Sequence, residues 1–260
     1  MLKNTYVLML AGCCIIGCFS GCSRSENDLN VVSDNSQTET NSTVTVPVSE
    51  SETTVHQSTT ELTDEEKITA VYNNCLESTF CIFTSSNNNG TGFLYKGQYI
   101  ITNAHILYDA EDLTIVDHKK SEHNGTVIFT DDATDIAVIQ IDGYEGRSVT
   151  LGDSDTVTTG EQIVMIGNPA DGEPFSFCTG SYVQLEDELK NLFNPDDRYI
   201  PVDADITSGY SGGPAFDLNG ELIGINNAAY TGDLSEYEFD HLGLLIPINR
   251  VIDEIDANTL

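Results

Sequence analysis

Most of the sequence from residue 80 onward consists of short runs rich in β-branched and aromatic residues, separated by Gly, Asn and Asp. Such runs favour extended backbone, whereas the residues between them favour turns. We expect strands at residues 80–84, 92–95, 99–102, 113–116, 126–129, 136–141, 162–166, 175–182, 221–225 and 243–246. Ten strands at this spacing predict an all-β fold, built either as barrels or as a sandwich.

Two short helices are expected at the ends of this region. Thr63 and Glu66 match a capping box, in which the two side chains satisfy free N–H groups at a helix start. Apolar residues then follow at helical spacing, and a closing helix is expected over residues 249–257. Hydrophobic residues make up 39% of the chain, which is enough for a sizeable core, so we expect a folded domain over residues 63–260.

The start of the chain has the features of a secretory signal peptide. Lys3 is followed by an apolar stretch of about 14 residues, shorter than the roughly 20 that cross a bilayer as a helix. The ending Phe-Ser-Gly-Cys resembles a bacterial lipobox, whose Cys is lipidated and becomes the new N-terminus. We therefore expect removal of residues 1–21 and a lipid anchor on Cys22, on the extracytoplasmic face of a bacterial membrane. Cys13, in Leu-Ala-Gly-Cys, and an ordinary signal-peptidase cut are the alternatives.

Residues 22–62 form a segment rich in Ser, Thr and Glu that contains no Phe, Tyr or Trp between residues 23 and 60. Such a composition cannot bury enough apolar surface to offset its ordering entropy. We interpret it as a disordered tether with a root-mean-square span of roughly 35 Å, which holds the domain off the membrane. His56 lies in this segment and is expected to be inert.

Three cysteines follow the tether: Cys75, Cys81 and Cys178. In an oxidising compartment Cys75 and Cys81 could form a disulfide, and three buried free thiols are the alternative.

The chain is strongly acidic. It has 42 Asp and Glu against 10 Lys and Arg, a net charge of −32, and from Glu61 onward 36 acidic residues face eight basic ones. A nucleic-acid partner is excluded, because phosphate contacts require clustered Lys and Arg. The acidic pairs at residues 131–132 and 153–155 are interpreted as turns, so neither a metal nor a cofactor is expected.

Three residues in informative surroundings suggest nucleophilic catalysis. His105 follows a predicted strand end, Asp135 opens a strongly apolar strand, and Ser211 lies in Gly-Tyr-Ser-Gly-Gly-Pro, where glycines allow a tight turn. A serine hydroxyl becomes a nucleophile when a neutral imidazole accepts its proton and a carboxylate fixes the imidazole tautomer. Each residue alone is weak evidence, but together they predict a His-Asp-Ser triad.

The segment around Ser211 also matches the G-x-S-x-G elbow of α/β-hydrolases. That elbow leads from a strand into a helix, and its partners follow in the order Ser, Asp, His. Here the segment leads into another strand and the order is His, Asp, Ser, which is the order of the chymotrypsin-type double barrel.

Several further motifs accompany the triad candidates in unbroken order over about residues 68–252. They are Thr-Gly-Phe at 91–93, Thr-Asn-Ala-His at 102–105, Asp-Ile-Ala-Val at 135–138, Leu-Gly-Asp-Ser at 151–154, Ile-Gly-Asn-Pro at 166–169, Ser-Gly-Gly-Pro at 211–214, Asn-Gly-Glu-Leu-Ile-Gly-Ile-Asn at 219–226 and Ile-Pro at 246–247. With these motifs the chain resembles the protease domain of the HtrA/Deg family of trypsin-like serine proteases.

The resemblance implies a pair of six-stranded β-barrels, the first at about residues 78–145 and the second at about residues 155–248. The first would supply His105 and Asp135, and the second Ser211. The backbone N–H groups of Gly209 and Ser211 would form the oxyanion hole.

Two features depart from the family pattern. A peptide-binding PDZ domain usually follows the protease, whereas this sequence predicts the protease domain only. The family commonly has Asn where Tyr210 stands, which affects the turn before the nucleophile.

The function expected from the sequence is a membrane-tethered extracytoplasmic serine endopeptidase acting on polypeptides. The alternatives are a catalytically silent, chaperone-like or peptide-binding lipoprotein on the same fold, and a glutamyl-type endopeptidase. Asp205 lies six residues before Ser211, the position at which trypsin-like enzymes with a basic preference place an acid, so it is a candidate specificity residue. The alternative is that Asp205 forms hydrogen bonds within its own loop and does not face the substrate. Family members often form trimers, which leaves room for a homo-oligomer.

Overall fold

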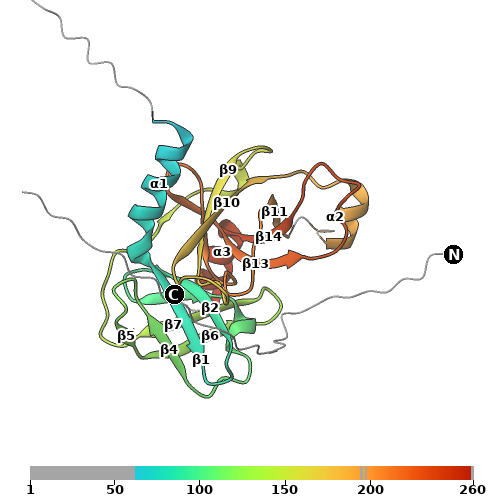
Figure 1. Ribbon diagram of the computed structural model, residues 1–260. Coiled ribbons are helices and arrows are strands. Elements are labelled where there is room, and N and C mark those ends of the chain that lie inside the picture. The colour runs from blue at the N-terminus through green and yellow to red at the C-terminus, as the bar shows by residue number, and fades with distance from the viewer. Residues whose placement is uncertain (1–61, 194–195, 197, 259–260) are drawn as a thin grey trace, which may run out of the picture. The chain divides into compact units, whose positions relative to one another are not determined.

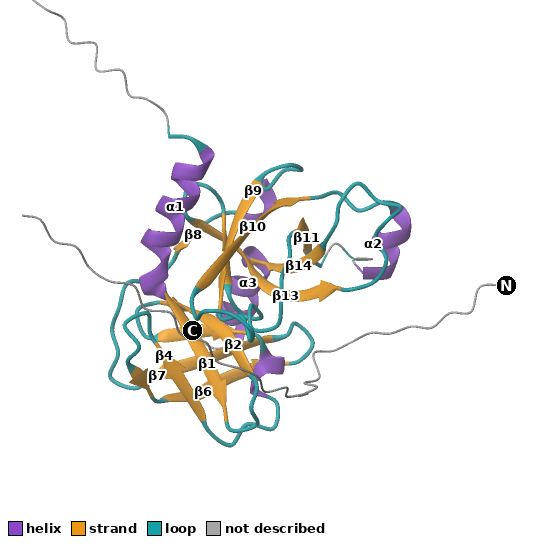
Figure 2. Cartoon of the chain, in the orientation of Figure 1, coloured by secondary structure: helices purple, strands orange, loops and turns teal. Residues whose placement is uncertain are grey.

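A computed structural model describes residues 62–193, 196 and 198–258 of the chain (Figure 1). Cys13, Cys22, His56 and the predicted signal peptide and tether lie outside the described residues. A compact unit begins at Leu62, one residue before the predicted start of the domain. Figure 2 shows that strands dominate this unit and fall into two groups, β1–β7 and β8–β14.

The first group is one antiparallel sheet in the order β5-β4-β1-β2-β3-β7-β6. Its strands are β1 (Thr79–Thr84), β2 (Asn89–Tyr95), β3 (Tyr99–Thr102), β4 (Leu113–Val116), β5 (Glu122–His123), β6 (Gly125–Asp131) and β7 (Ile136–Ile141). Phe80, Leu94 and Ile139 are fully buried in its core. A Cβ atom added at Gly125 on β6 would lie 2.7 Å from Ile115 on β4, so the sheet curls until its two ends approach each other.

The second group has the order β12-β9-β10-β11-β14-β13-β8. Its strands are β8 (Thr150–Leu151), β9 (Gln162–Gly167), β10 (Ser176–Tyr182), β11 (Ile200–Asp203), β12 (Pro214–Phe216), β13 (Glu221–Tyr230) and β14 (Leu242–Pro247). β12 also pairs with β13, which closes six strands into a ring, and β8 adds to β13 in parallel outside that ring.

The predicted all-β double-barrel fold is confirmed, and all ten predicted strands are present. The described residues contain four more strands: β5, β8, β11 and β12. Six strands of each sheet form its barrel, as predicted, and the two-residue β5 or β8 is a seventh strand added to it. Two residues are too few to produce an alternating hydrophobic pattern, so such strands leave no sequence signal.

The described residues contain three α-helices: α1 (Asp64–Cys75), α2 (Asp187–Phe193) and α3 (Ile248–Asn258). The capping box of α1 forms as predicted, because Thr63 Oγ1 accepts from Glu66 N at 3.3 Å and Glu66 Oε2 accepts from Thr63 N at 2.9 Å. The sequence analysis missed α2. Three 3₁₀ segments, η1 (Leu76–Ser78), η2 (Ala104–Leu107) and η3 (Ser154–Thr156), complete the elements. None of the helices in the described part of the chain has the length and apolar character needed to span a membrane.

A shared core joins the two sheets. It contains Phe93 and Val138 from the first sheet, Ile166 and Phe216 from the second, and Val251 from α3. This packing holds the two sheets against each other without a disulfide, because Cys75, Cys81 and Cys178 are all free thiols. Of the two alternatives that the sequence left open, the structure therefore has the free thiols.

Candidate active site

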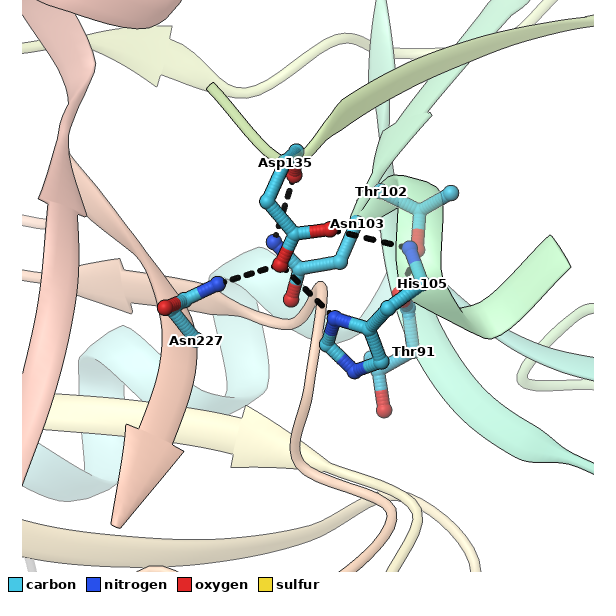
Figure 3. A network of polar contacts seen from close by, with 6 residues as sticks. All are labelled: Thr91, Thr102, Asn103, His105, Asp135 and Asn227. Carbon is cyan, nitrogen blue, oxygen red and sulfur yellow. Dashed lines mark hydrogen bonds and ion pairs between the residues drawn. The ribbon is translucent and has the colours of Figure 1, made fainter. Parts of the chain in front are cut away.

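His105 and Asp135 contact each other where two neighbouring strands of the first sheet, β3 and β7, end and begin. His105 lies on η2, directly after β3, and its Nδ1 is 2.7 Å from Asp135 Oδ2 (Figure 3). An ionised carboxylate can only accept hydrogen bonds, so Nδ1 donates and the neutral imidazole keeps its lone pair on Nε2. The Asp135 side chain also fixes the backbone of its partner, because His105 N donates to Asp135 Oδ1 at 2.9 Å.

The backbone of Asp135 is held in an unusual conformation just before β7. Its φ is +56°, in the left-handed region that Asp tolerates better than most residues. Its carbonyl accepts from Asn103 Nδ2 at 2.9 Å and from Ala104 N at 3.3 Å. The two chain segments that carry His105 and Asp135 are therefore joined by hydrogen bonds that involve the backbone as well as the side chains.

Asn227 is a further member of this network that the sequence analysis missed. Its Nδ2 donates to Asp135 Oδ2 at 2.5 Å, so that oxygen accepts from both Asn227 and His105 (Figure 3). Asn227 lies on β13 and Asp135 directly precedes β7 of the first sheet, so this hydrogen bond links the two sheets at the site.

The turn that carries Ser211 lies against the turn that carries His105. A Cβ atom added at Gly212 would be 2.1 Å from Thr102 Oγ1 and 3.0 Å from Asn103 N, and the φ of Gly212 is +79°. Only glycine fits both the space and the conformation. Thr91 N donates to the Ser211 carbonyl at 2.9 Å, which ties the turn to β2. Within the described residues, the Ser211 hydroxyl has no hydrogen bond.

Two backbone N–H groups in this turn are available as donors. The Ser208 carbonyl accepts from Ala170 N at 3.0 Å, and the Tyr210 carbonyl accepts from Gly213 N at 2.8 Å. In a trans peptide the N–H points opposite to the carbonyl, so the N–H groups of Gly209 and Ser211 point away from these partners. Neither N–H has an acceptor among the described residues.

Buried threonine hydroxyls support the turn from the first sheet. Thr91 Oγ1 donates to the Gly209 carbonyl at 2.7 Å and accepts from Asn168 N at 2.9 Å. Thr102 Oγ1 in turn donates to the Thr91 carbonyl at 2.6 Å. Both threonines are fully buried, so their hydroxyls cannot exchange these partners for water. Thr91 and Thr102 each begin one of the sequence motifs described above, but the sequence alone did not indicate that they support this turn.

Asp205 lies outside this network. Its side chain is 75% exposed, and its Oδ1 is 4.0 Å from His241 Nε2. His241 also has its Nδ1 3.6 Å from Asp203. A role of Asp205 in specificity stays a prediction.

Comparisons with known proteins place the chain in a family. Residues 90–225 match the family model of the trypsin-like peptidase domain. A probable periplasmic serine endoprotease, DegP-like, of Pseudomonas putida strain W619 is 34% identical over 168 residues, which is 63% of this chain and 33% of that protein. The corresponding protein of Halomonas elongata is 33% identical over 171 residues, 64% of this chain and 34% of that protein.

Two solved structures have a similar fold. An HtrA-type protease with a tripeptide has a TM-score of 0.63 and 23% identity, over 73% of this chain and 62% of that one. Rv3671c from M. tuberculosis, in an inactive form, has a TM-score of 0.59 and 22% identity, over 73% of this chain and 92% of that one. This chain spans about a third of the length of the curated relatives that it matches.

Proposed function

The chain belongs to the family of trypsin-like peptidase domains, and from this premise we propose that it is an extracytoplasmic serine endopeptidase of the HtrA/Deg type. The observation that carries the proposal is the hydrogen bond from His105 Nδ1 to Asp135, which leaves Nε2 as a base beside the Ser211 turn.

In the proposed reaction, His105 Nε2 accepts the proton of the Ser211 hydroxyl while Oγ attacks the carbonyl carbon of a peptide bond. The tetrahedral intermediate collapses when the same imidazole returns the proton to the departing amine, which leaves an acyl-enzyme on Ser211. Water, deprotonated by His105, then attacks the ester, and the imidazolium returns the proton to Ser211 Oγ as the acid is released. The unpaired N–H groups of Gly209 and Ser211 would stabilise the oxyanion of each tetrahedral intermediate.

Asp135 has the role of holding the imidazole in one tautomer and stabilising the imidazolium that forms. Its carboxylate accepts three hydrogen bonds, from His105 N, His105 Nδ1 and Asn227 Nδ2, which hold the side chain in the orientation that this role requires. The proposal therefore depends on the second sheet as well as the first, because Asn227 comes from β13.

Attachment to a membrane through lipidated Cys22 is part of the proposal. The periplasmic relatives support an extracytoplasmic location, and the lipobox resemblance at Cys22 supports an anchor. Mass spectrometry of the mature protein should find a lipidated Cys22 at its N-terminus, and Cys22→Ala should release or mis-process the protein. An unmodified N-terminus at another residue would contradict the anchor and leave the protease proposal intact.

The function is tested by cleavage of a denatured peptide library. The wild type should cleave internal peptide bonds, and Ser211→Ala should cleave none while keeping its circular dichroism spectrum. Absence of cleavage by the folded wild type would favour a silent, chaperone-like protein. Cleavage confined to bonds after Glu would assign a glutamyl-type endopeptidase. A preference for Lys or Arg that disappears in Asp205→Ala would give Asp205 its predicted role.

A further inference from the structure

The residue before the nucleophile, Tyr210, points its ring into the core of the second sheet. Tyr210 is only 5% exposed and belongs to a cluster of buried apolar residues from β9, β11 and β14, which includes Met165, Val202 and Leu245. The ring is therefore part of the interior of the second sheet.

The Tyr210 ring lies directly on Gly167, the last residue of β9. A Cβ atom added at Gly167 would be 2.4 Å from Tyr210 Cδ1, 2.6 Å from Cγ and 2.9 Å from Cε1. Atoms cannot approach so closely, so any side chain at residue 167 would displace the ring. The Tyr210 ring therefore fills the space that a side chain at residue 167 would occupy.

The backbone next to Gly167 contacts the other side of the same turn. Asn168 N donates to the Gly209 carbonyl at 3.3 Å. A Cβ atom added at Gly209 would be 1.9 Å from the Asn168 carbonyl oxygen. Ala170 N donates to the Ser208 carbonyl. The ring and these backbone hydrogen bonds thus fix the peptide groups on both sides of Gly209, whose N–H is one of the two unpaired donors.

We propose that Tyr210 is a positioning residue for catalysis, whose ring, seated on Gly167, holds the Gly209 and Ser211 N–H groups in the orientation that stabilises the oxyanion. This inference rests on the proposed function and adds to it the residue that orients the donors. Tyr210 itself does not contact the reacting atoms. The ring rather than the hydroxyl carries the effect, because the close contacts with Gly167 involve ring carbons.

The inference is tested with Tyr210→Ala, Tyr210→Phe and Gly167→Ala in the full chain, using a peptide substrate and a fluorophosphonate probe. Tyr210→Ala should lower kcat and the labelling rate at least about 100-fold, the loss typical of one misplaced oxyanion donor. KM should change by less than about threefold, because the oxyanion forms only in the transition state. Tyr210→Phe should stay within about threefold of the wild type, and Gly167→Ala should fall towards Tyr210→Ala.

Ile163→Ala is the matched control, since Ile163 is fully buried in the same cluster at the other end of β9. It should lower the melting temperature and leave kcat within about threefold of the wild type. If Tyr210→Ala does not fold, Gly167→Ala and Tyr210→Phe decide the question, because neither removes the ring.

Three results would overturn the inference: a folded Tyr210→Ala or Gly167→Ala variant with wild-type kcat, a Tyr210→Phe variant as slow as Tyr210→Ala, or an equal loss of kcat in Ile163→Ala. If the probe labels the wild type and the Tyr210→Ala variant equally fast, only this inference fails. If the wild type itself is not labelled, the proposed function fails and the inference fails with it.

Discussion

Asp135 Oδ2 accepts from His105 Nδ1 and from Asn227 Nδ2, and the two interactions lead to separate predictions. In Asp135→Asn the new amide can present an N–H to the imidazole, which then holds the wrong tautomer with its proton facing Ser211. Turnover of a peptide substrate should fall by about 10⁴-fold with little change in folding. Asp132→Asn, an exposed neighbour, is the control and should keep its activity. A nearly active Asp135→Asn together with an inactive Asp132→Asn would show that the acid is assigned incorrectly.

Asn227→Ala removes one donor from the Asp135 carboxylate. Losing a hydrogen bond to a charged group costs about 1.5–3 kcal/mol, so kcat should fall by roughly 10- to 100-fold. Asn73→Ala, an exposed change on α1, is the control. Equal kcat values for these two variants would mean that Asn227 does not position Asp135.

Some of these site residues could be predicted from the sequence, and others could not. His105, Asp135 and Ser211 were selected because their motifs lie in a characteristic order, and the structure places the first two in contact and the turn of the third beside them. Asn227 could not be found in this way, because its partner is 92 residues distant and one Asn in a strand is not distinctive. Tyr210 could be recognised from the sequence only as a departure from the family, since the direction of a side chain depends on tertiary packing.

At the scale of elements, the turn between β4 and β5 depends on a buried carboxylate. Asp117 accepts from Ser121 N at 2.8 Å, from Lys119 N at 2.9 Å and from His123 Nε2 at 3.1 Å. Burial favours the neutral form of the carboxyl, but these hydrogen bonds outweigh it and hold the pKa of Asp117 below its ordinary value of 3.8. The turn therefore gains stability from the ionised form.

A carboxyl whose pKa is lower in the folded than in the unfolded state stabilises the fold above the unfolded pKa and loses that contribution as the pH falls through the folded pKa. Asp117→Asn should therefore lower the melting temperature most near pH 7, and the difference from the wild type should shrink below about pH 4. The exposed Asp171→Asn should change little at either pH. A difference that grows on acidification would contradict the assigned direction of the shift.

The long strands and terminal helices were predictable because their signals are local. An apolar run such as residues 136–141 determines its own strand, and the Thr63 capping box determines the start of α1. β8 has two residues, and its pairing with β13 is set by the fold around it. α2 is also determined by tertiary context, because Leu185 and Leu189 are buried against Leu234, Leu242 and Leu244 from a distant part of the chain.

At the scale of the whole molecule, the charge of the protein should affect which substrates it encounters. From Glu61 onward the chain has 36 acidic and eight basic residues, so the domain attracts cationic chains electrostatically. Dissolved salt screens this attraction. We expect kcat/KM for a Lys-rich peptide to fall as NaCl rises from about 20 to about 500 mM, because the Debye length shortens as the ionic strength rises. A neutral peptide with the same cleavage site should show a much smaller change, and equal salt dependence of the two would contradict electrostatic attraction.

The double-barrel fold brings residues from two sheets into one site, and we propose that this site makes Ser211 a nucleophile. Labelling of the folded protein by a fluorophosphonate probe tests the claim most directly, because the probe reacts with a serine only when a base and an oxyanion site activate it. The wild type should be labelled covalently at Ser211, and Ser211→Ala and His105→Ala variants of unchanged circular dichroism should not be labelled. An unlabelled folded wild type, or equal labelling of Ser211→Ala, would contradict this proposal.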